Sequence, residues 1–419
     1  MLSKKITFCT YDAPSFHGPN TWLKRLLPQL RSNGFSIEIL VFFEGDLNEC
    51  ETYKYFAGLG FSLKTFDFKS IAEKKIKWIL ETLSANPPDI FVPNMIVHAL
   101  FAAAWVKKAG IPTIGMLHSD DKFYDGIIKE FVNGKEEFKL ACVVTCSKFL
   151  YNKVKSKSNG NIIVKSIPYG VPTNNIPQTS FDESTLKLIY VGRLVEKQKR
   201  ISKVIKAMCK ASNEIDGVEG IIYGNGDVEK TTSLIRKLSL DNKVKFGGAL
   251  SNEEIFNTLS KAHVFVLLSD YEGLPQSLLE AMACGLVPVC SDMKSGIPEL
   301  IIHNQTGIIV KNRKSEFVQA IKILRTDSAL LNELSKNVKQ KVLEYSSEAC
   351  TISWISLLNE LQLKNMHKSK IEIPSTISLP KPHPNLKFED VRTSTSANKF
   401  LEGMRKTKAF HLLKKLISS

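Results

Sequence analysis

Long apolar segments are absent from this chain of 419 residues. No stretch approaches the roughly 20 consecutive apolar residues that a membrane-spanning helix requires. The first residues, MLSKKITFCTYDAP, also lack the apolar segment of a secretory signal peptide. These absences lead us to expect a cytoplasmic protein that has no membrane span.

Cysteine pairs and acidic metal motifs are also missing. The eight cysteines are scattered, and although Cys142 and Cys146 fall on one side of a predicted strand, no second pair lies near them to complete a zinc site. The sequence Ser-Asp-Asp at 119–121 does not have the spacing of a metal-binding Asp-x-Asp element. We therefore expect no bound metal, and most cysteines should be small buried side chains in a reducing compartment.

Negative charge is in short supply, since 42 Asp and Glu stand against 57 Lys and Arg and the net charge is +15. The region from Lys364 to Ser419 holds twelve of the basic and four of the acidic residues, and so contributes +8 of that total. A basic surface suits an anionic partner such as a nucleotide-sugar, an acidic lipid or a nucleic acid. The sequence has no nucleic-acid-binding motif and no interleaved aromatic stripe, so we do not expect nucleic acid as a partner.

A chain of this length suits two domains rather than a single core. Segments typical of strands alternate with segments typical of helices over the first half, and the alternation restarts at Leu186, which predicts doubly wound parallel sheets of the α/β class. Prolines at 168, 172 and 177 mark the linker. The predicted strands are 6–10, 35–43, 89–93, 112–117, 142–146, 188–191, 218–223, 244–246 and 264–268. The predicted helices are 22–31, 71–84, 99–108, 201–210, 231–238, 253–260, 276–284 and 347–363.

The most informative segment runs from 263 to 310 and holds two carboxylates, Glu272 and Glu280. An apolar strand leads into Gly273, Leu274 and Pro275, and a helix should then begin with Pro275 in its first position and continue from Gln276. The free backbone N–H groups at the start of such a helix suit a phosphate or a sugar hydroxyl. Glu280, more than a turn inside the helix, can accept two hydrogen bonds from a vicinal diol such as a ribose.

This segment, with E-G-L-P, L-L-E-A-M-A-C-G, P-V, G-I-P-E-L and T-G in order, resembles the C-terminal signature of family 4 retaining glycosyltransferases. The resemblance implies a GT-B fold of two facing Rossmann-like domains. The first would be the acceptor-binding domain 1–172, with the helix 347–363 crossing back to it. The second would be the donor-binding domain 173–346, and 364–419 would form a basic tail. The donor would be a nucleoside-diphosphate sugar, with Glu272 facing the transferred sugar.

A second element of the resemblance is Gly192-Arg193-Leu194 followed by a lysine. In the family this arginine and lysine hold the donor diphosphate. An Arg fork and a Lys point charge suit the negative charge that builds on the leaving phosphate, so no cofactor or metal is required. The family usually has glycine after the lysine, whereas this chain has Arg200, so that either Lys197 or Lys199 is a candidate for the phosphate ligand.

Glycine loops complete the expected nucleotide pocket. Tyr-Gly-Asn-Gly-Asp at 223–227 fails as a dinucleotide fingerprint because Glu229 occupies the third small position. The resemblance instead places Gly192, Gly224 and Gly248 in loops that line the nucleotide pocket. Gly18 lies between a strand and a helix in the first half, where backbone can approach a phosphate, although Pro19 replaces the family's second glycine.

His118 ends the predicted strand 112–117, at the carboxyl edge where such sheets bind ligands. It resembles the active-site histidine of the family, which contacts the transferred sugar, and a structural role is the alternative. Asp120 and Asp121 follow, either to bind the acceptor or as a solvated turn. The family mechanism implied for this chain is front-face attack with retention, in which the leaving phosphate oxygen takes the acceptor proton.

The sequence predicts a hexosyltransferase, with saccharides or lipid-linked saccharides as acceptors. Two alternatives stay open: a nucleotide-sugar-binding protein without transfer activity, and another GT-B enzyme such as a phosphorylase or epimerase. In the tail, we predict a flexible linker over 364–398 and a short amphipathic helix over 405–417 with one basic side. That helix can lie on an anionic membrane, which would make the protein peripheral at the inner face, or it can pack against the protein itself.

Overall fold

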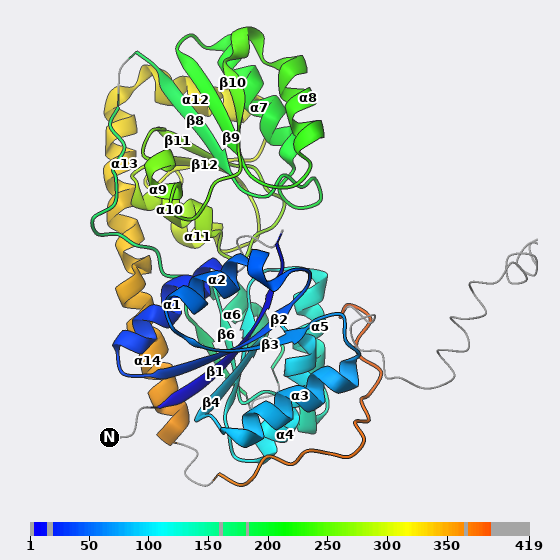
Figure 1. Cartoon of the computed structure of the whole chain (residues 1–419). Coiled ribbons are helices and arrows are strands. Elements are labelled where there is room, and N and C mark those ends of the chain that lie inside the picture. The colour runs from blue at the N-terminus through cyan, green and yellow to red at the C-terminus, as the bar shows by residue number, and fades with distance from the viewer. Residues whose placement is uncertain (1–3, 15–19, 159–161, 182–183, 364–367, 387–419) are drawn as a thin grey trace, which may run out of the picture.

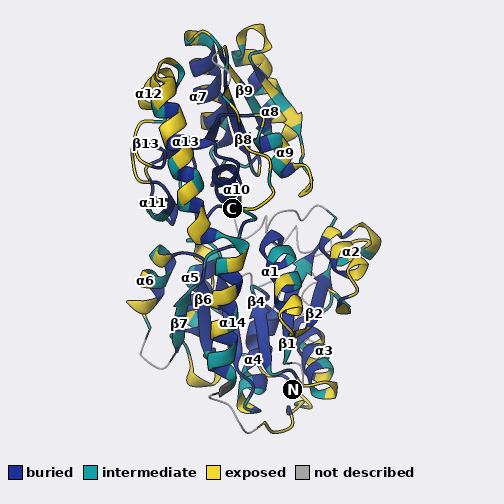
Figure 2. Cartoon of the chain, turned by 90° about the vertical axis from the view of Figure 1, so that its left-hand side faces the viewer, coloured by how far each residue is buried: buried dark blue, intermediate teal, exposed yellow. Residues whose placement is uncertain are grey.

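The computed structural model describes residues 4–14, 20–158, 162–181, 184–363 and 368–386. Two α/β domains lie one above the other, and each is built on a parallel sheet with helices on both faces (Figure 1). The predicted α/β class, with two Rossmann-like domains built on doubly wound parallel sheets, is confirmed. Figure 2 shows the strands buried at the centre of each domain while the outer faces of the helices are exposed.

The sheet of the first domain has the strand order β3-β2-β1-β4-β5-β6-β7 within the described residues. Its strands are β1 (Lys5–Asp12), β2 (Ser36–Phe43), β3 (Ser62–Asp67), β4 (Ile90–Asn94), β5 (Thr113–Leu117), β6 (Cys142–Thr145) and β7 (Ile163–Ser166). Its helices are α1 (Thr21–Ser32), α2 (Glu51–Gly58), α3 (Ala72–Ala85), α4 (Val97–Lys108), α5 (Lys122–Phe131) and α6 (Lys148–Lys155). The strand order reverses between β1 and β4, and in such sheets ligands bind outside the carboxyl ends of the strands at the reversal.

The sheet of the second domain has the order β10-β9-β8-β11-β12-β13, and it reverses between β8 and β11. Its strands are β8 (Leu186–Val191), β9 (Val218–Tyr223), β10 (Val244–Gly248), β11 (Val264–Leu267), β12 (Val287–Ser291) and β13 (Ile308–Val310). Its helices are α7 (Ile201–Glu214), α8 (Val228–Leu238), α9 (Ile255–Leu259), α10 (Gln276–Ala283), α11 (Ile297–Leu300), α12 (Ser315–Thr326) and α13 (Ser328–Val342). The reversal places the end of β8 beside the end of β11, which are the two places where the sequence predicts donor ligands.

The last helix, α14 (Ser347–Leu363), follows the second domain in the chain but packs on α1 and β4 of the first (Figure 1). Trp354 of α14 stacks on Trp22 of α1, with the ring centroids 6.1 Å apart. One continuous apolar cluster joins α14, the inner face of the first sheet and helix α10 of the second domain. The two domains are therefore tied together by a shared core as well as by the chain.

The structure contradicts one tail prediction. The segment 368–386 has no regular secondary structure, yet it lies along the first domain rather than forming a flexible linker (Figure 1). Ile371, Ile377 and Leu386 are buried in the apolar cluster that includes α3, α4 and α5. Burial of these three large apolar side chains holds a Pro- and Ser-rich segment on the surface of the first domain. We call 368–386 the strap. The predicted helix 405–417 lies outside the described residues.

No helix among the described residues combines the length and the apolar character needed to cross a membrane.

Candidate donor site between the two domains

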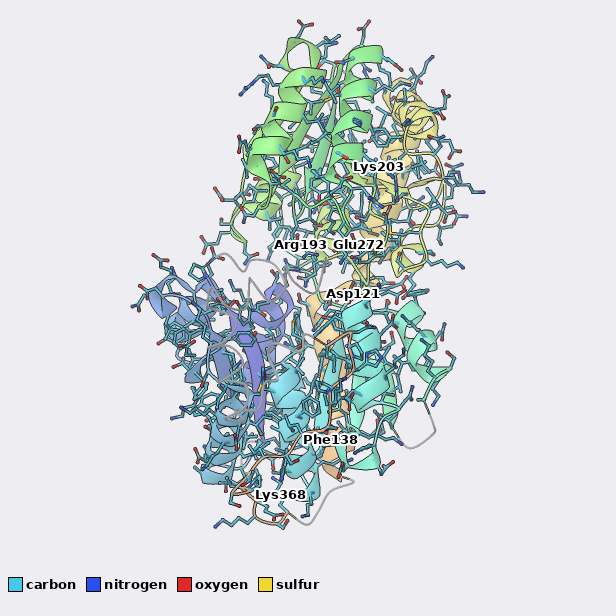
Figure 3. The ribbon with its side chains drawn as sticks, turned by 90° about the vertical axis from the view of Figure 1, so that its right-hand side faces the viewer. Asp121, Phe138, Arg193, Lys203, Glu272 and Lys368 are labelled. Atoms are coloured by element: carbon cyan, nitrogen blue, oxygen red, sulfur yellow. The ribbon has the colours of Figure 1, made fainter. Side chains whose placement is uncertain are left out.

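The predicted diphosphate ligands lie at the strand reversal of the second sheet. Arg193 follows β8, and Glu272 stands in the turn between β11 and α10, so that the topology alone brings them to one edge. Figure 3 shows Arg193 and Glu272 at the edge of the second domain that faces Asp121 of the first. This edge is where a doubly wound sheet binds its ligand.

A chain of polar contacts links these residues. Arg193 donates from Nη2 to Oε1 of Gln198 at 2.5 Å, and Gln198 donates from Nε2 to the Tyr271 carbonyl at 3.1 Å. Lys199 forms an ion pair with Glu272, with Nζ 2.6 Å from Oε1. Both Lys199 and Glu272 are buried, so that each charge depends on the other for compensation. Arg193 itself is exposed and open to an anionic ligand.

The structure distinguishes the two candidate lysines. Lys199 is buried beside Glu272, whereas Lys197 is exposed. Arg200, in place of the usual glycine, adopts a left-handed backbone with φ +52° at the start of α7. A glycine would adopt this conformation without strain. Arg200 is instead held by an ion pair with Asp270, which also pairs with Arg313 at 2.7 Å.

The three glycines predicted to line the nucleotide pocket in the second domain lie in adjacent loops. Gly192 donates from its backbone N–H to the Tyr223 carbonyl at 3.2 Å, and Gly224 donates to the Gly248 carbonyl at 2.8 Å. Gly224 has φ +152°, and a Cβ atom there would overlap the Gly192 carbonyl. The ends of β8, β9 and β10 therefore form one surface of backbone atoms. A ligand can approach this surface more closely than it could if side chains covered it.

The start of α10 differs from the prediction in the place of Pro275, and the residue Gly273 before it packs against the first domain. Pro275 precedes the first helical residue instead of occupying that position, and α10 begins at Gln276. Gly273 is packed against the first domain, because a Cβ atom there would overlap the His118 carbonyl. Leu274 is buried in the core shared by the two domains. Gln276 has a buried Oε1 atom with no hydrogen-bond partner among the described residues.

Glu280 is buried in α10, where the sequence predicts a ribose ligand. Its Oε1 atom accepts a short hydrogen bond from Nη2 of Arg25, which comes from α1 in the other domain. Sequence reasoning missed Arg25, because an arginine on an amphipathic helix ordinarily faces solvent. The residue lies 255 positions from its partner, and only the packing of the two domains brings them together.

His118 follows β5 at the carboxyl edge of the first sheet, as predicted. Its Nδ1 atom lies 2.6 Å from Oη of Tyr169 and its Nε2 atom lies 2.8 Å from Oδ1 of Asn94. Burial lowers the pKa of the imidazole to about 3, so that the ring is neutral at physiological pH. Because Oδ1 of Asn94 can only accept, Nε2 carries the proton, and Nδ1 accepts from Tyr169.

The remaining candidates in the first domain have local partners. Asp121 caps α5 by accepting from the backbone N–H groups of Phe123 and Tyr124, at 2.9 and 3.3 Å. Asp120 forms an ion pair with Lys153. Gly18 lies outside the described residues.

The remaining candidates are the cysteines and the other side chains that could bind a metal. All eight cysteines lie in the described part of the chain, where they are buried and form no disulfide. Burial raises the pKa of Cys146 and of Cys284 to about 12, so that both thiols are protonated. No group of three or more His, Cys, Asp or Glu among the described residues is placed to hold a metal ion.

The second domain matches a known protein family in sequence. The sequence model described as "Glycosyl transferases group 1" matches residues 172–341, which span the second domain from its linker to α13. Residues 172–341 form a glycosyl transferases group 1 domain. The matched region contains Arg193, Lys199, Glu272 and Glu280, whereas the first domain lies outside it.

Two named relatives belong to the same group of functions. The amylovoran biosynthesis glycosyltransferase AmsK of Erwinia amylovora is 39% identical over 144 residues, which are 32% of this chain and 35% of that protein. The match to this relative thus spans about a third of its length. The lipopolysaccharide 1,6-galactosyltransferase of Escherichia coli K12 is 26% identical over 314 residues, 72% of this chain and 84% of that protein. Both names describe glycosyltransferases, one of amylovoran biosynthesis and one of lipopolysaccharide.

A solved structure extends the likeness of fold to both domains. Anabaena HepE in complex with UDP and glucose superimposes with a TM-score of 0.68 and 18% identity, over 85% of this chain and all of that chain. At this identity the superposition shows the GT-B fold.

Proposed function

We propose that the chain is a family 4 retaining glycosyltransferase, which moves a hexose from a nucleoside-diphosphate sugar to a hydroxyl group of a saccharide or lipid-linked acceptor. The process would be cell-envelope or extracellular polysaccharide synthesis, as the names of the relatives suggest. The observation that carries the proposal is the linked set Arg193, Gln198, Lys199 and Glu272 at the strand reversal of the second sheet.

The chemistry of this set suits the departure of a diphosphate. When the bond between the sugar C1 atom and the phosphate oxygen breaks, negative charge grows on the β-phosphate. Arg193 offers exposed N–H donors there, and Lys199, which is linked to Arg193 through Glu272 and Gln198, adds a second positive charge. Two fixed cations can stabilise the leaving group without a divalent metal, so we propose that none is required.

The other assignments follow from position. Glu272 would bind the transferred sugar, Glu280 the ribose, and neutral His118 would meet the sugar from the first domain. The acceptor oxygen would attack C1 on the face that the phosphate leaves, and the departing phosphate oxygen would take the acceptor proton. Both ring nitrogens of His118 are already bound within the first domain, so contact with a sugar would require exchange of its bond to Tyr169 or Asn94.

A donor screen tests this function. Purified protein is incubated with UDP-, GDP-, ADP- and dTDP-hexoses, with and without a chelator, and nucleotide release is measured before and after addition of saccharide acceptors. We expect release from at least one donor, unaffected by the chelator, and a product one hexose heavier by mass spectrometry. Binding of a donor without release or product would favour a nucleotide-sugar-binding protein instead.

A further inference from the structure

The ion pair between Arg25 and Glu280 joins the two domains inside the proposed donor site. Arg25 stands in the second turn of α1, and Glu280 lies in the second turn of α10. Side-chain exposure is 14% for Arg25 and 6% for Glu280, so the pair is shielded from water. The guanidinium also lies 5.9 Å from the ring centroid of Phe256 on α9, another element of the second domain.

The pair leaves hydrogen-bonding capacity unused on the guanidinium of Arg25. Arg25 donates to Glu280 from Nη2 alone, and Nη1 is buried without a hydrogen-bond partner among the described residues. A guanidinium normally meets a carboxylate with both prongs of its fork. A buried nitrogen without an acceptor costs about 1–3 kcal/mol, so a group that supplies the acceptor is favoured at this place.

A ribose hydroxyl matches this unused capacity, because it donates one hydrogen bond and accepts others. The hydroxyl can donate to the carboxylate of Glu280 and accept from Nη1 of Arg25. Neither a phosphate, which would be repelled by Glu280, nor an apolar group could satisfy both. We propose that Arg25 is a donor-site residue supplied by the acceptor domain, which clamps the ribose together with Glu280.

This inference rests on the proposed function, since it takes Glu280 as the ribose ligand. The clamp also gives the first domain a part in donor binding, which a site within the second domain alone would not do. A nucleotide held by both domains stabilises their closed arrangement, and the ribose becomes the group by which the first domain detects that a donor is bound. Arg25 would also confer a preference for ribonucleotides over deoxyribonucleotides.

Calorimetric titration of the full chain tests the clamp. UDP, GDP and ADP are titrated first, and the tightest binder is then compared with its 2′-deoxy and 3′-deoxy analogues. Arg25→Gln should weaken binding of the diphosphate about tenfold or more, the effect of losing a charge-assisted hydrogen bond. It should also reduce the preference over at least one deoxy analogue. A purely structural role of Arg25 would not change that preference.

Arg31→Gln is the matched control, since Arg31 lies on the same helix but has its hydrogen bond and its ring contact within the first domain, with the Leu59 carbonyl and the Phe61 ring. Should Arg25→Gln unfold, as judged by its thermal transition, Arg25→Lys replaces it, because lysine keeps the charge and loses the second prong. Equal or tighter diphosphate binding by the Arg25 variant overturns the clamp and makes Arg25 a competitor of the ribose. An equal loss for ribose and deoxyribose ligands also overturns it.

Glu280→Gln separates the clamp from the function on which it rests. If this variant loses affinity and ribose preference while Arg25→Gln keeps both, the donor site stands and the clamp is wrong. If no diphosphate binds the wild type, or if Glu280→Gln binds as well as the wild type, the donor-site assignment itself fails and the clamp fails with it.

Discussion

At the scale of single residues, the two glutamates of the donor segment have different environments. Glu272 is bound by Lys199 and lies within 3.4 Å of Nε2 of Gln198, both from the loop after β8. Glu280 is bound by Arg25 from the other domain. Glu272 thus belongs to the hydrogen-bonded set of the proposed diphosphate site. Glu280 lies within α10 and has its partner in the other domain.

This difference predicts separable effects of neutral substitutions. Glu280→Gln should weaken binding of the free nucleoside diphosphate by about 1–2 kcal/mol, through loss of a charge-assisted hydrogen bond. Glu272→Gln should leave that binding nearly unchanged and lower transfer, because its partner would be the sugar. Calorimetry with the nucleotide alone, alongside the transfer assay, distinguishes the two. Equal losses of nucleotide affinity in both variants would contradict these roles.

Arg193 provides a second prediction at this scale. Arg193→Ala should reduce turnover by about 100-fold or more, the usual effect of removing one strong transition-state donor, and should reduce donor affinity less. Lys197→Ala is the control, since Lys197 is exposed in the same loop and should retain near-wild-type turnover. A folded Arg193→Ala protein with wild-type turnover would exclude the diphosphate role.

His98, in the first turn of α4, gives a prediction about pH. The side chain is 1% exposed, neither ring nitrogen has a partner among the described residues, and burial together with nearby Lys75 lowers its pKa to about 3. The unfolded chain, with a pKa near 6.5, binds the proton more readily, so stability is full above pH 6.5 and falls as the pH drops towards 3. Between pH 7.5 and 5.5, His98 should account for about 1 kcal/mol of lost unfolding free energy. Urea unfolding of His98→Phe should show a correspondingly smaller loss, and an identical pH dependence would refute the assignment.

Sequence reasoning located residues whose role depends on local context and missed those that depend on domain packing. Arg193, Glu272 and Glu280 stand in continuous motifs with glycine and proline at fixed positions, so their place at strand ends follows from the chain itself. Arg25 belongs to no such motif, and Glu299, although it stands in the G-I-P-E-L motif, has its partners in the other domain. Glu299 accepts backbone hydrogen bonds from Lys148 and Phe149 of the first domain at 2.9 and 2.8 Å, a contact that no local pattern encodes.

At the scale of elements, the central strands were predicted and the edge strands of the first sheet were not. β1, β4, β5 and β6 have short apolar runs because neighbours cover both faces. β3 is the outermost strand, and its sequence SLKTFD is half-buried or exposed throughout. β7 at the other edge contains only four residues. Short polar edge strands avoid pairing with other chains, and the same property removes the apolar signal that identifies a strand.

For the strap, the prediction from amino-acid composition was wrong. Its prolines and serines suggested a flexible linker, yet it is fixed at several points along the first domain. Ser369 donates from its backbone N–H to the Ala109 carbonyl at 3.0 Å, and Glu372 pairs with Lys108 at 2.8 Å. Its last described residue, Leu386, packs against Gly126 in α5.

The strap predicts an uneven response to truncation of its side chains. Leu386→Ala should destabilise the first domain by about 2–4 kcal/mol, because a fully buried side chain leaves a cavity. Ile373→Ala, on the same strap with 38% exposure, should change stability by less than about 0.5 kcal/mol. Chemical denaturation of both variants provides the comparison. Two equally small effects would show that the strap is not part of the folded core.

At the scale of the whole molecule, the strap determines where the last described residue, Leu386, lies. The chain ends α14 at the far end of the first domain and returns along its side to α5 (Figure 1). Asp121 caps α5, and Figure 3 shows Asp121 on the side of the first domain that faces Arg193 and Glu272. The last described residue, Leu386, therefore packs near the end of α5 that faces the proposed active site.

The position of Leu386 makes the membrane prediction for residues 387–419 more specific. Residues 387–419 carry eight Lys and Arg against three Asp and Glu, and each basic residue near an anionic surface adds about 1 kcal/mol of binding. Truncation after Leu363 would also remove the strap and its buried side chains, so the informative truncation follows Leu386. That shortened chain should keep its thermal stability and its transfer to a soluble acceptor, but should no longer sediment with anionic vesicles.

Neutral vesicles and high salt, which screens surface charge, should abolish sedimentation of the full chain as well. Undiminished sedimentation after removal of 387–419 would place the membrane contact elsewhere on the basic surface, whereas a lowered thermal stability would mean that the tail packs on the protein.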